Sequence, residues 1–222
     1  MYRNFRSGQP IQGINIQQYT KQKMTKFKSL AAVVLVGSLL VGSSFTSKVN
    51  SFKVNVAKSS LKWVATKVTG KHDGTLKLAN GSLESNGKMV TGGAFDIDMN
   101  SLACTDITDK ETNGNFLGHL RSEEFFSIDK HKTAHFEIQK VVPTKGNEYD
   151  VTGKLTIKGI TNEVTFPATI TTSPKGVKAT AKITVDRTKF DIKFRSGKFF
   201  EGLGDKLIYD DFVIDLNLEA GE

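Results

Sequence analysis

The strongest constraint on the fold is an alternation of apolar and polar residues that recurs along the chain from residue 52 onward. Between Val177 and Val185 every second residue is apolar, and Phe212, Ile214 and Leu216 repeat the pattern near the C-terminus. Side chains of a strand point alternately to its two sides, so a period of two indicates strands with one buried face. We therefore predict an all-β fold.

About eight strands are expected, because the alternating segments are short and follow one another at hairpin spacing. Asn80-Gly81, Asn86-Gly87 and Pro174-Lys-Gly176 are turn signals, and residues 70–74 indicate a further break. Such a series is typical of a sandwich or a barrel, and a closed barrel of eight strands is just wide enough to hold one ligand. The nine alternating segments on which this estimate rests cover residues 52–56, 61–68, 75–78, 93–99, 134–142, 149–158, 163–172, 177–185 and 211–219.

Residues 106–127 break the alternation and predict a short helical insertion. Phe116 and Leu120 lie at helical spacing, and an N-cap is expected within residues 105–108. Residues 122–126 are expected to add a separate helical turn. The insertion therefore holds one or two short helices.

The first 47 residues differ in composition from the rest of the chain. Lys26 and Lys28 precede the apolar run Leu30–Gly42, which is too short to span a bilayer and is followed by small residues. We predict a secretory signal peptide over residues 24–47 and, because Met24 is a natural start, an over-extended gene start over residues 1–23. The folded domain would then cover residues 48–222, with no membrane span after cleavage.

Most of the net charge of +8 belongs to this N-terminal part. Residues 1–47 carry six of the 31 basic residues and none of the 23 acidic ones, which leaves a net charge of +2 on the rest. No dense basic patch remains, so a nucleic-acid partner is not expected. The single Cys104 excludes an intrachain disulfide framework, and a domain of this size is expected to be held by its core.

Several segments together resemble the YceI-like family, secreted lipocalin-like proteins that bind polyisoprenoid lipids. The similarity extends over residues 50–220 and departs from the family at Lys130–Thr133, where members often carry a proline. The segments are the Trp63 strand with Gly70-Lys-His-Asp-Gly74, His119-Leu-Arg-Ser-Glu-Glu-Phe-Phe, Ala134-His-Phe, Gly153-Lys-Leu-Thr-Ile-Lys-Gly-Ile-Thr, and the closing strand Asp211–Leu218.

The resemblance implies an eight-stranded antiparallel lipocalin-like barrel in the periplasm, without catalysis or a cofactor. Its interior would hold a long isoprenoid or similar amphiphilic lipid, such as a quinone or a prenyl-phosphate, and a homodimer is plausible by analogy. His119 and Arg121 are expected near the tunnel mouth. The apolar tunnel is expected to be lined by Trp63, Phe95, Ile97, Phe116, Leu120, Phe126, Phe136, Ile138, Leu155, Ile157, Phe166, Ile183, Phe212 and Ile214.

The residues themselves give little support to metal binding or to catalysis. His131 and His135 are four apart and His119 is a possible third ligand, but no cysteine or carboxylate stands at a recognised ligand spacing. Glu123 and Glu124 are adjacent, so they would not face each other on a helix. Two other functions stay open: a hydrolase or isomerase with His119 as base, and a ligand-free scaffold for protein partners.

Overall fold

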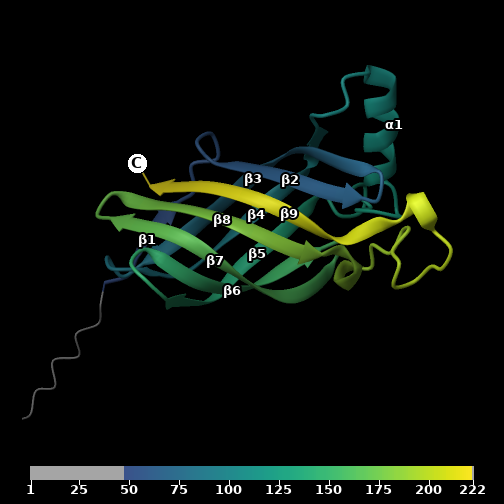
Figure 1. Cartoon of the computed structure of the whole chain (residues 1–222). Helices are drawn as coiled ribbons and strands as arrows, with labels where there is room; N and C mark the ends of the chain where they lie inside the picture. Colours follow the sequence, from purple (N-terminus) through teal and green to yellow (C-terminus); the bar gives the residue numbers. More distant parts are fainter. Residues whose placement is uncertain (1–47, 222) are drawn as a thin grey trace, which may run out of the picture. The chain divides into compact units, whose positions relative to one another are not determined.

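The computed structural model describes residues 48–221, most of which lie in strands (Figure 1). The signal peptide and the over-extended start predicted over residues 1–47 lie outside the described residues. Within the described part of the chain, no helix is long and apolar enough to cross a membrane. In chain order the elements are β1 (Asn50–Lys53), β2 (Ser60–Lys67), β3 (Gly70–Ser85), β4 (Val90–Cys104), α1 (Lys110–Arg121), β5 (Thr133–Pro143), β6 (Glu148–Ile157), β7 (Ile160–Ser173), β8 (Gly176–Asp186), η1 (Arg187–Phe190), η2 (Gly204–Lys206) and β9 (Ile208–Gly221).

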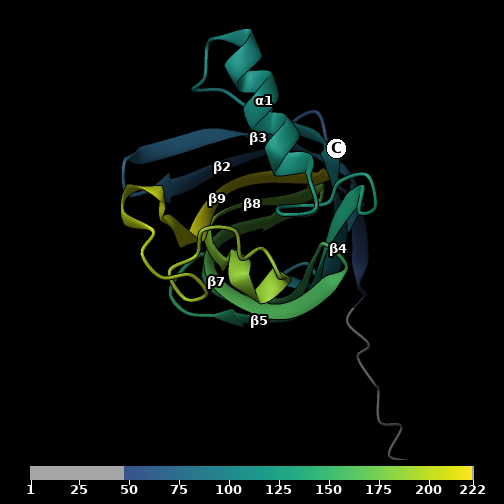
Figure 2. The ribbon, with the colours of Figure 1, turned by 90° about the vertical axis from the view of Figure 1, so that its right-hand side faces the viewer.

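Eight strand positions close into an antiparallel barrel, which confirms the predicted fold class. The order is β3-β2-β9-β8-β7-β6-β5-β4, and β4 pairs again with β3 to complete the ring (Figure 2). β1 is not a further position in the ring, because β1 and β2 pair with successive parts of the same edge of β3. Residues 54–59 interrupt this shared position, and Val54 bridges to Ala220 of β9.

The alternation seen in the sequence sorts side chains between the core and the surface. In β8, Ala181, Ile183 and Val185 are more buried than Lys182 and Thr184, which lie between them. Inward side chains from all of the barrel strands meet in one apolar cluster. Removal of this apolar surface from water is the main term that favours closure of the barrel.

Two predicted breaks lie inside a single long strand. The sequence predicts a break at residues 70–74, which the structure replaces with a turn at residues 68–69, and a turn at residues 80–81; β3 runs through both predicted positions for 16 residues. A Cβ at Gly81 would lie 2.5 Å from Cβ of Phe95 on β4. The prediction was wrong because this glycine provides space for a neighbouring aromatic residue, which is a second use of glycine in strands.

The two ends of the barrel differ. One end, here called the hairpin end, carries the short β3–β4, β5–β6 and β7–β8 turns, and the predicted turns at residues 86–87 and 174–176 lie there. The other, here called the open end, carries the β2–β3 and β6–β7 turns and two long connections, residues 105–132 and 187–207. Figure 1 shows α1 and the β8–β9 connection at this same end.

The helical insertion is one helix followed by turns. The Asp109 side chain caps α1 by accepting a hydrogen bond from the Thr112 N–H at 2.9 Å, one residue later than the predicted cap region. Ser122 leaves the helical conformation with a ψ of 171°, so α1 ends at Arg121. Residues 122–126, predicted as a helical turn, therefore form hydrogen-bonded turns without a second helix.

Candidate functional site

A cavity of about 520 Å³ occupies the barrel interior on the side of the open end. This volume is within the range of about 300–1,000 Å³ typical of small-molecule sites. Its wall is mainly apolar and combines side chains from the strands, from α1 and from the β8–β9 connection. The exposed side chains of Asp205 and Lys206 are part of the lining, so the cavity reaches solvent beside the 187–207 connection.

Most of the predicted tunnel residues meet around this cavity. The predicted mouth residue His119 also lines it, whereas Arg121 points to β4, where Nη2 lies 3.3 Å from Oδ1 of Asn100. Nine of the fourteen predicted tunnel residues line the cavity, namely Trp63, Ile97, Phe116, Leu120, Phe126, Leu155, Ile157, Phe212 and Ile214. The other five, which pack in or against the core without lining the cavity, are Phe95, Phe136, Ile138, Phe166 and Ile183.

Trp63 forms part of the cavity wall, and contacts with β3 and β4 hold the edge of its indole that carries Nε1. Its indole Nε1 donates a hydrogen bond to the Ala103 carbonyl at 3.1 Å. Gly74 lies beneath the ring, where a Cβ would stand 2.6 Å from a ring carbon. The ring is therefore buried with its one polar group satisfied, as a buried tryptophan requires.

A row of aromatic rings lies in the core on the hairpin-end side of the cavity-lining residues Ile97 and Ala134. The ring centroids of Phe95 and Phe136 are 5.3 Å apart, and those of Phe136 and Phe166 are 5.6 Å apart. These spacings are those of packed aromatic pairs. The row explains why these three predicted tunnel residues do not face the empty space: they form its floor.

His119 joins the helical insertion to the β8–β9 connection at the mouth of the cavity. Its ring packs edge-on against Phe125 at 4.9 Å and against Phe194 at 4.7 Å between centroids. Its Nε2 lies 2.8 Å from a carboxylate oxygen of Glu124. The other acidic residue of the pair, Glu123, pairs with Lys130 at the surface, so the two carboxylates do not act together.

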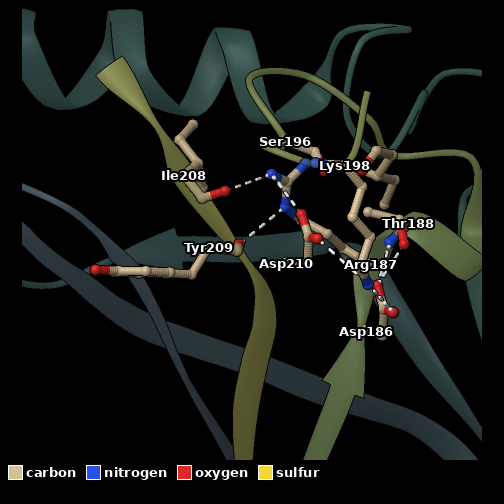
Figure 3. Close-up of polar contacts among 9 residues, drawn as sticks. Asp186, Arg187, Thr188, Ser196, Lys198, Ile208, Tyr209 and Asp210 are labelled. Carbon is tan, nitrogen blue, oxygen red and sulfur yellow. Dashed lines mark hydrogen bonds and ion pairs between the residues drawn. The ribbon is translucent and has the colours of Figure 1, made fainter. Parts of the chain in front are cut away.

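Arg187 is the buried charge that holds the β8–β9 connection to the start of β9 (Figure 3). Its guanidinium donates to the carbonyls of Tyr209 at 3.1 Å, Ile192 at 2.7 Å and Ile208 at 2.9 Å. Burial lowers its pKa from the ordinary value, and the nearby carboxylate of Asp210, 3.6 Å away, acts in the opposite direction. An arginine stays charged under such conditions.

The rim of the cavity is mainly basic. Lys67 ends β2, and Arg195 and Lys206 belong to the 187–207 connection, while Asp205 is the acidic residue among these lining side chains. The Arg195 guanidinium lies 4.9 Å from the centre of the Phe194 ring. Sequence reasoning missed this rim because its residues come from separate segments that only the closed barrel brings together.

Three possible metal-donor side chains gather where β3 begins and β4 ends. Oδ2 of Asp106 lies 2.8 Å from Nδ1 of His72, and Cys104 Sγ donates to Oδ1 of Asp106 at 3.1 Å. The Asp73 N–H also donates to that carboxylate, at 3.0 Å. Each donor is thus already engaged by another member of the group.

The protonation states of this group follow from its contacts. Burial raises the pKa of the Cys104 thiol, and its hydrogen bond to Asp106 raises it further. Partial burial raises the pKa of Asp106, but hydrogen bonds from the Asp73 backbone, Cys104 and His72 outweigh it and lower the pKa to about 2. The group is therefore a carboxylate that receives hydrogen bonds, with a protonated thiol and the His72 side chain beside it.

The histidines compared in the sequence do not form a common site. His135 faces outward from β5, with Nδ1 2.6 Å from an oxygen of Asp96 on β4. His131 lies beside Gly159 in the β6–β7 turn, and His119 is at the cavity mouth. Among the described residues, the group of three donor side chains is His72, Cys104 and Asp106.

The chain is thus an eight-stranded antiparallel barrel around an apolar cavity, which is the architecture of the lipocalin-like barrels. The YceI-like domain model matches residues 52–220, and the chain belongs to the YceI-like family.

Comparison with curated relatives gives short matches. Over 50 residues the chain is 44% identical to a UPF0312 protein of Pectobacterium atrosepticum and 46% identical to one of Serratia proteamaculans. These matches cover 22% of this chain and 26% of each relative. The aligned segment therefore spans about a quarter of the length of these relatives.

Two solved structures have similar folds. Burkholderia cenocepacia BcnA matches with a TM-score of 0.53 and 22% identity over 75% of this chain and 99% of that chain. A polyisoprenoid binding domain from Saccharophagus degradans, implicated in plant cell wall breakdown, matches with a TM-score of 0.54 and 14% identity over 77% and 97%. At such identities the similarity shows the shared fold.

Proposed function

We propose that the protein binds a long isoprenoid or similar amphiphilic lipid in the barrel and carries or sequesters it in the periplasm. The observation that carries the proposal is the apolar cavity of about 520 Å³ with a basic rim. Such a site suits a ligand with an apolar tail and a polar head, and a prenyl-phosphate or a quinone has both. The description of the S. degradans neighbour as a polyisoprenoid binding domain supports the same ligand class.

The cavity favours the tail and leaves the head at the rim. Burial of one methylene group contributes about 0.8 kcal/mol before the costs of binding. Realised values for larger ligands are about 0.3 kcal/mol per heavy atom, so about 20 buried atoms would give about 6 kcal/mol, or a Kd of tens of micromolar. Contacts of the head with Lys67, Arg195 and Lys206 are therefore expected to add to the affinity.

A binding function accounts for the polar residues better than a catalytic one. His119 is engaged by Glu124 and by two phenylalanine rings, and the buried Cys104 thiol has a raised pKa, which disfavours the reactive thiolate. The enzymatic alternative predicts a different result: His119→Ala would abolish catalytic activity while the lipid stays bound in the cavity.

The first experiment is native mass spectrometry of the protein purified from the organism that makes it, combined with lipid mass spectrometry of an organic extract. We expect a stoichiometric adduct whose mass identifies an isoprenoid or a related amphiphile. A clean mass of the unliganded chain, with no uptake of an added quinone or prenyl-phosphate, would refute the proposal.

A pair of variants links the adduct to the cavity. Ala65 faces into the cavity from β2, so Ala65→Trp should fill part of the space and reduce the adduct severalfold. Val142 is exposed on β5 near the hairpin end, so Val142→Trp should leave the adduct unchanged. Equal lipid occupancy in both variants would place the ligand elsewhere.

A further inference from the structure

The β8–β9 connection exposes two adjacent phenylalanines beside the cavity. The exposed fractions of Phe199 and Phe200 are 49% and 50%. Single exposed apolar residues are common on protein surfaces, whereas a contiguous exposed apolar patch is a candidate surface for a partner. Tyr209, 51% exposed at the start of β9, and Val68, 47% exposed in the β2–β3 turn, lie at the same end of the barrel.

The pair lies on the segment that forms the cavity mouth. Phe194, Arg195 and Lys206 of the same connection line the cavity, on either side of the pair in sequence. In Figure 2 this connection lies across the open end of the barrel, beside α1. A partner that contacts Phe199 and Phe200 would therefore lie close to the mouth of the cavity.

The connection also carries an excess of positive charge. Between residues 187 and 209 the exposed basic residues outnumber the exposed acidic ones by five to three. Two of these basic residues are ion-paired, Lys193 with Asp191 at 2.7 Å and Lys198 with Asp186 at 2.9 Å, and Lys193 also holds its Nζ 5.1 Å from the centre of the Phe199 ring. The basic residues are Lys189, Lys193, Arg195, Lys198 and Lys206, and the acidic ones are Asp191, Glu201 and Asp205.

Local hydrogen bonds fix the way in which the pair is presented. The N–H groups of Phe199 and Phe200 both donate to the carbonyl of Ser196, at 3.1 and 3.0 Å, and Ser196 is fully buried. Lys198, the residue before the pair, contacts Asp186 at 2.9 Å (Figure 3). The two rings therefore stay outward because the turn beneath them is bonded to the barrel.

We propose that this connection docks the open end of the barrel on the surface of an anionic lipid bilayer, with Phe199 and Phe200 inserted among the headgroups. Aromatic side chains favour the interface between water and lipid, and basic residues are attracted to anionic headgroups. The inference rests on the proposed lipid cargo, because a cargo of that kind resides in a bilayer. Docking in this orientation lets the tail pass into the cavity without crossing water.

The test measures binding of the full chain to vesicles made of equal parts phosphatidylglycerol and phosphatidylethanolamine, by co-sedimentation. The affinity of the double variant Phe199→Asp with Phe200→Asp for these vesicles should be lower by about tenfold or more, because two half-exposed rings are lost and two negative charges are added. Val142→Asp, at an exposed apolar position near the hairpin end, is the matched control and should bind like the parent. Vesicles of phosphatidylcholine alone should bind the parent less.

A second measurement identifies the end that touches the bilayer whatever residues 1–47 contribute to vesicle binding. A polarity-sensitive fluorophore on Glu201→Cys, next to the pair, should shift to shorter wavelength when vesicles are added. The same fluorophore on Lys145→Cys, in the β5–β6 turn, should not shift, and the buried Cys104 is common to both variants. Cavity occupancy is followed in parallel with a prenyl-phosphate added in detergent.

The outcomes separate this inference from the proposed function. Loss of vesicle binding in the double aspartate variant, with occupancy in detergent unchanged, supports docking. Equal sedimentation of parent and double variant, or a shift only at position 145, overturns it while the lipid cargo stands. Failure of occupancy in detergent instead overturns the proposed cargo. Absence of vesicle binding with normal occupancy also overturns docking.

Discussion

At individual positions, glycines on one strand make room for aromatic rings on the next. Gly74 lies beneath Trp63 in the cavity wall, and Gly153 on β6 faces the ring of Phe136 on β5. Because Gly153 has no side chain, Phe136 can lie flat against β6 and join the aromatic row that forms the cavity floor. The depth of the cavity therefore depends on a residue that does not touch it.

We predict that Gly153→Ala destabilises the barrel. The new Cβ would overlap the Phe136 ring and the Glu137 carbonyl, so the strand or the ring must shift. Overpacking of this kind costs about 1–3 kcal/mol, which urea unfolding followed by tryptophan fluorescence would detect. Gly114→Ala, in the interior of α1 with open space around it, is the control and should be neutral or stabilise by up to about 1 kcal/mol. Equal effects at both sites would contradict the role given to Gly153.

The sequence predicted ten of the 28 residues that line the cavity, namely nine tunnel residues and His119, and those that lie on strands follow from the alternation. It did not distinguish wall from floor: Ile97 lines the cavity, whereas Phe95, two residues earlier on the same face of β4, belongs to the aromatic row. Arg187 and Phe194 were missed because they lie in a connection without periodicity. The position of Arg187 depends on its hydrogen bonds to β9, which no local pattern records.

Among the elements, β6 to β9 were predicted closely and β3 was not. The expected strand over residues 149–158 becomes Glu148–Ile157, and the one over residues 177–185 becomes Gly176–Asp186. The alternation of apolar and polar residues is uninterrupted in these strands, so the pattern alone predicts where they lie. In β3 the glycines that receive aromatic rings have the same appearance as turn signals, and the difference lies in contacts with the neighbouring strand.

Helix α1 is lightly attached to the barrel. It has one buried residue, Leu120, and Asn113 anchors its first turn by donating to the carbonyls of Cys104 at 3.0 Å and Ile107 at 2.8 Å. Its inner face supplies Phe116, His119 and Leu120 to the cavity wall. A bound lipid would therefore add contacts to a helix that has few of its own.

We expect the amides of residues 114–121 to exchange hydrogen faster than those of β6 and β7 in the empty protein, since few buried contacts oppose local opening. A lipid in the cavity should slow exchange in α1 by about tenfold or more and leave β6 and β7 nearly unchanged. Hydrogen-exchange mass spectrometry with and without a bound prenyl-phosphate measures both. Protection confined to the hairpin end would show that the helix does not contact the ligand.

For the whole molecule, no intrachain disulfide contributes to stability. The barrel is held together by its apolar core, by the hydrogen bonds between its strands and by a small number of charged contacts. Cys104, the single cysteine, is buried and free. Asp106 ties the start of β3 to the end of β4 through His72, Asp73 and Cys104, at the place where the helical insertion leaves the barrel. Protonation of this carboxylate would weaken all three contacts.

Stability should therefore fall on acidification through a defined window. The pKa of Asp106 is about 2 in the folded chain and 3.8 ordinarily, so its contribution is full above about pH 4 and is lost as the pH falls to about 2. After allowance for solvent screening, we expect a loss of about 1 kcal/mol. Urea unfolding at a series of pH values measures it. Asp106→Asn should be less stable at neutral pH and should show a shallower decline; an unchanged decline would assign acid sensitivity to other carboxylates.

The aromatic row beneath the cavity closes it on the side of the hairpin end, so in the barrel formed by residues 48–221 the cavity opens only at the open end. A lipid that enters tail first must leave head first by the same route, and a second molecule cannot push the first one through. Direction of transport would then come from differences between donor and acceptor at the mouth, because the path through the protein has none. Under the proposed carrier function, the protein would equilibrate its lipid between donor and acceptor, and the lifetime of the complex would depend on how firmly the rim retains the head group.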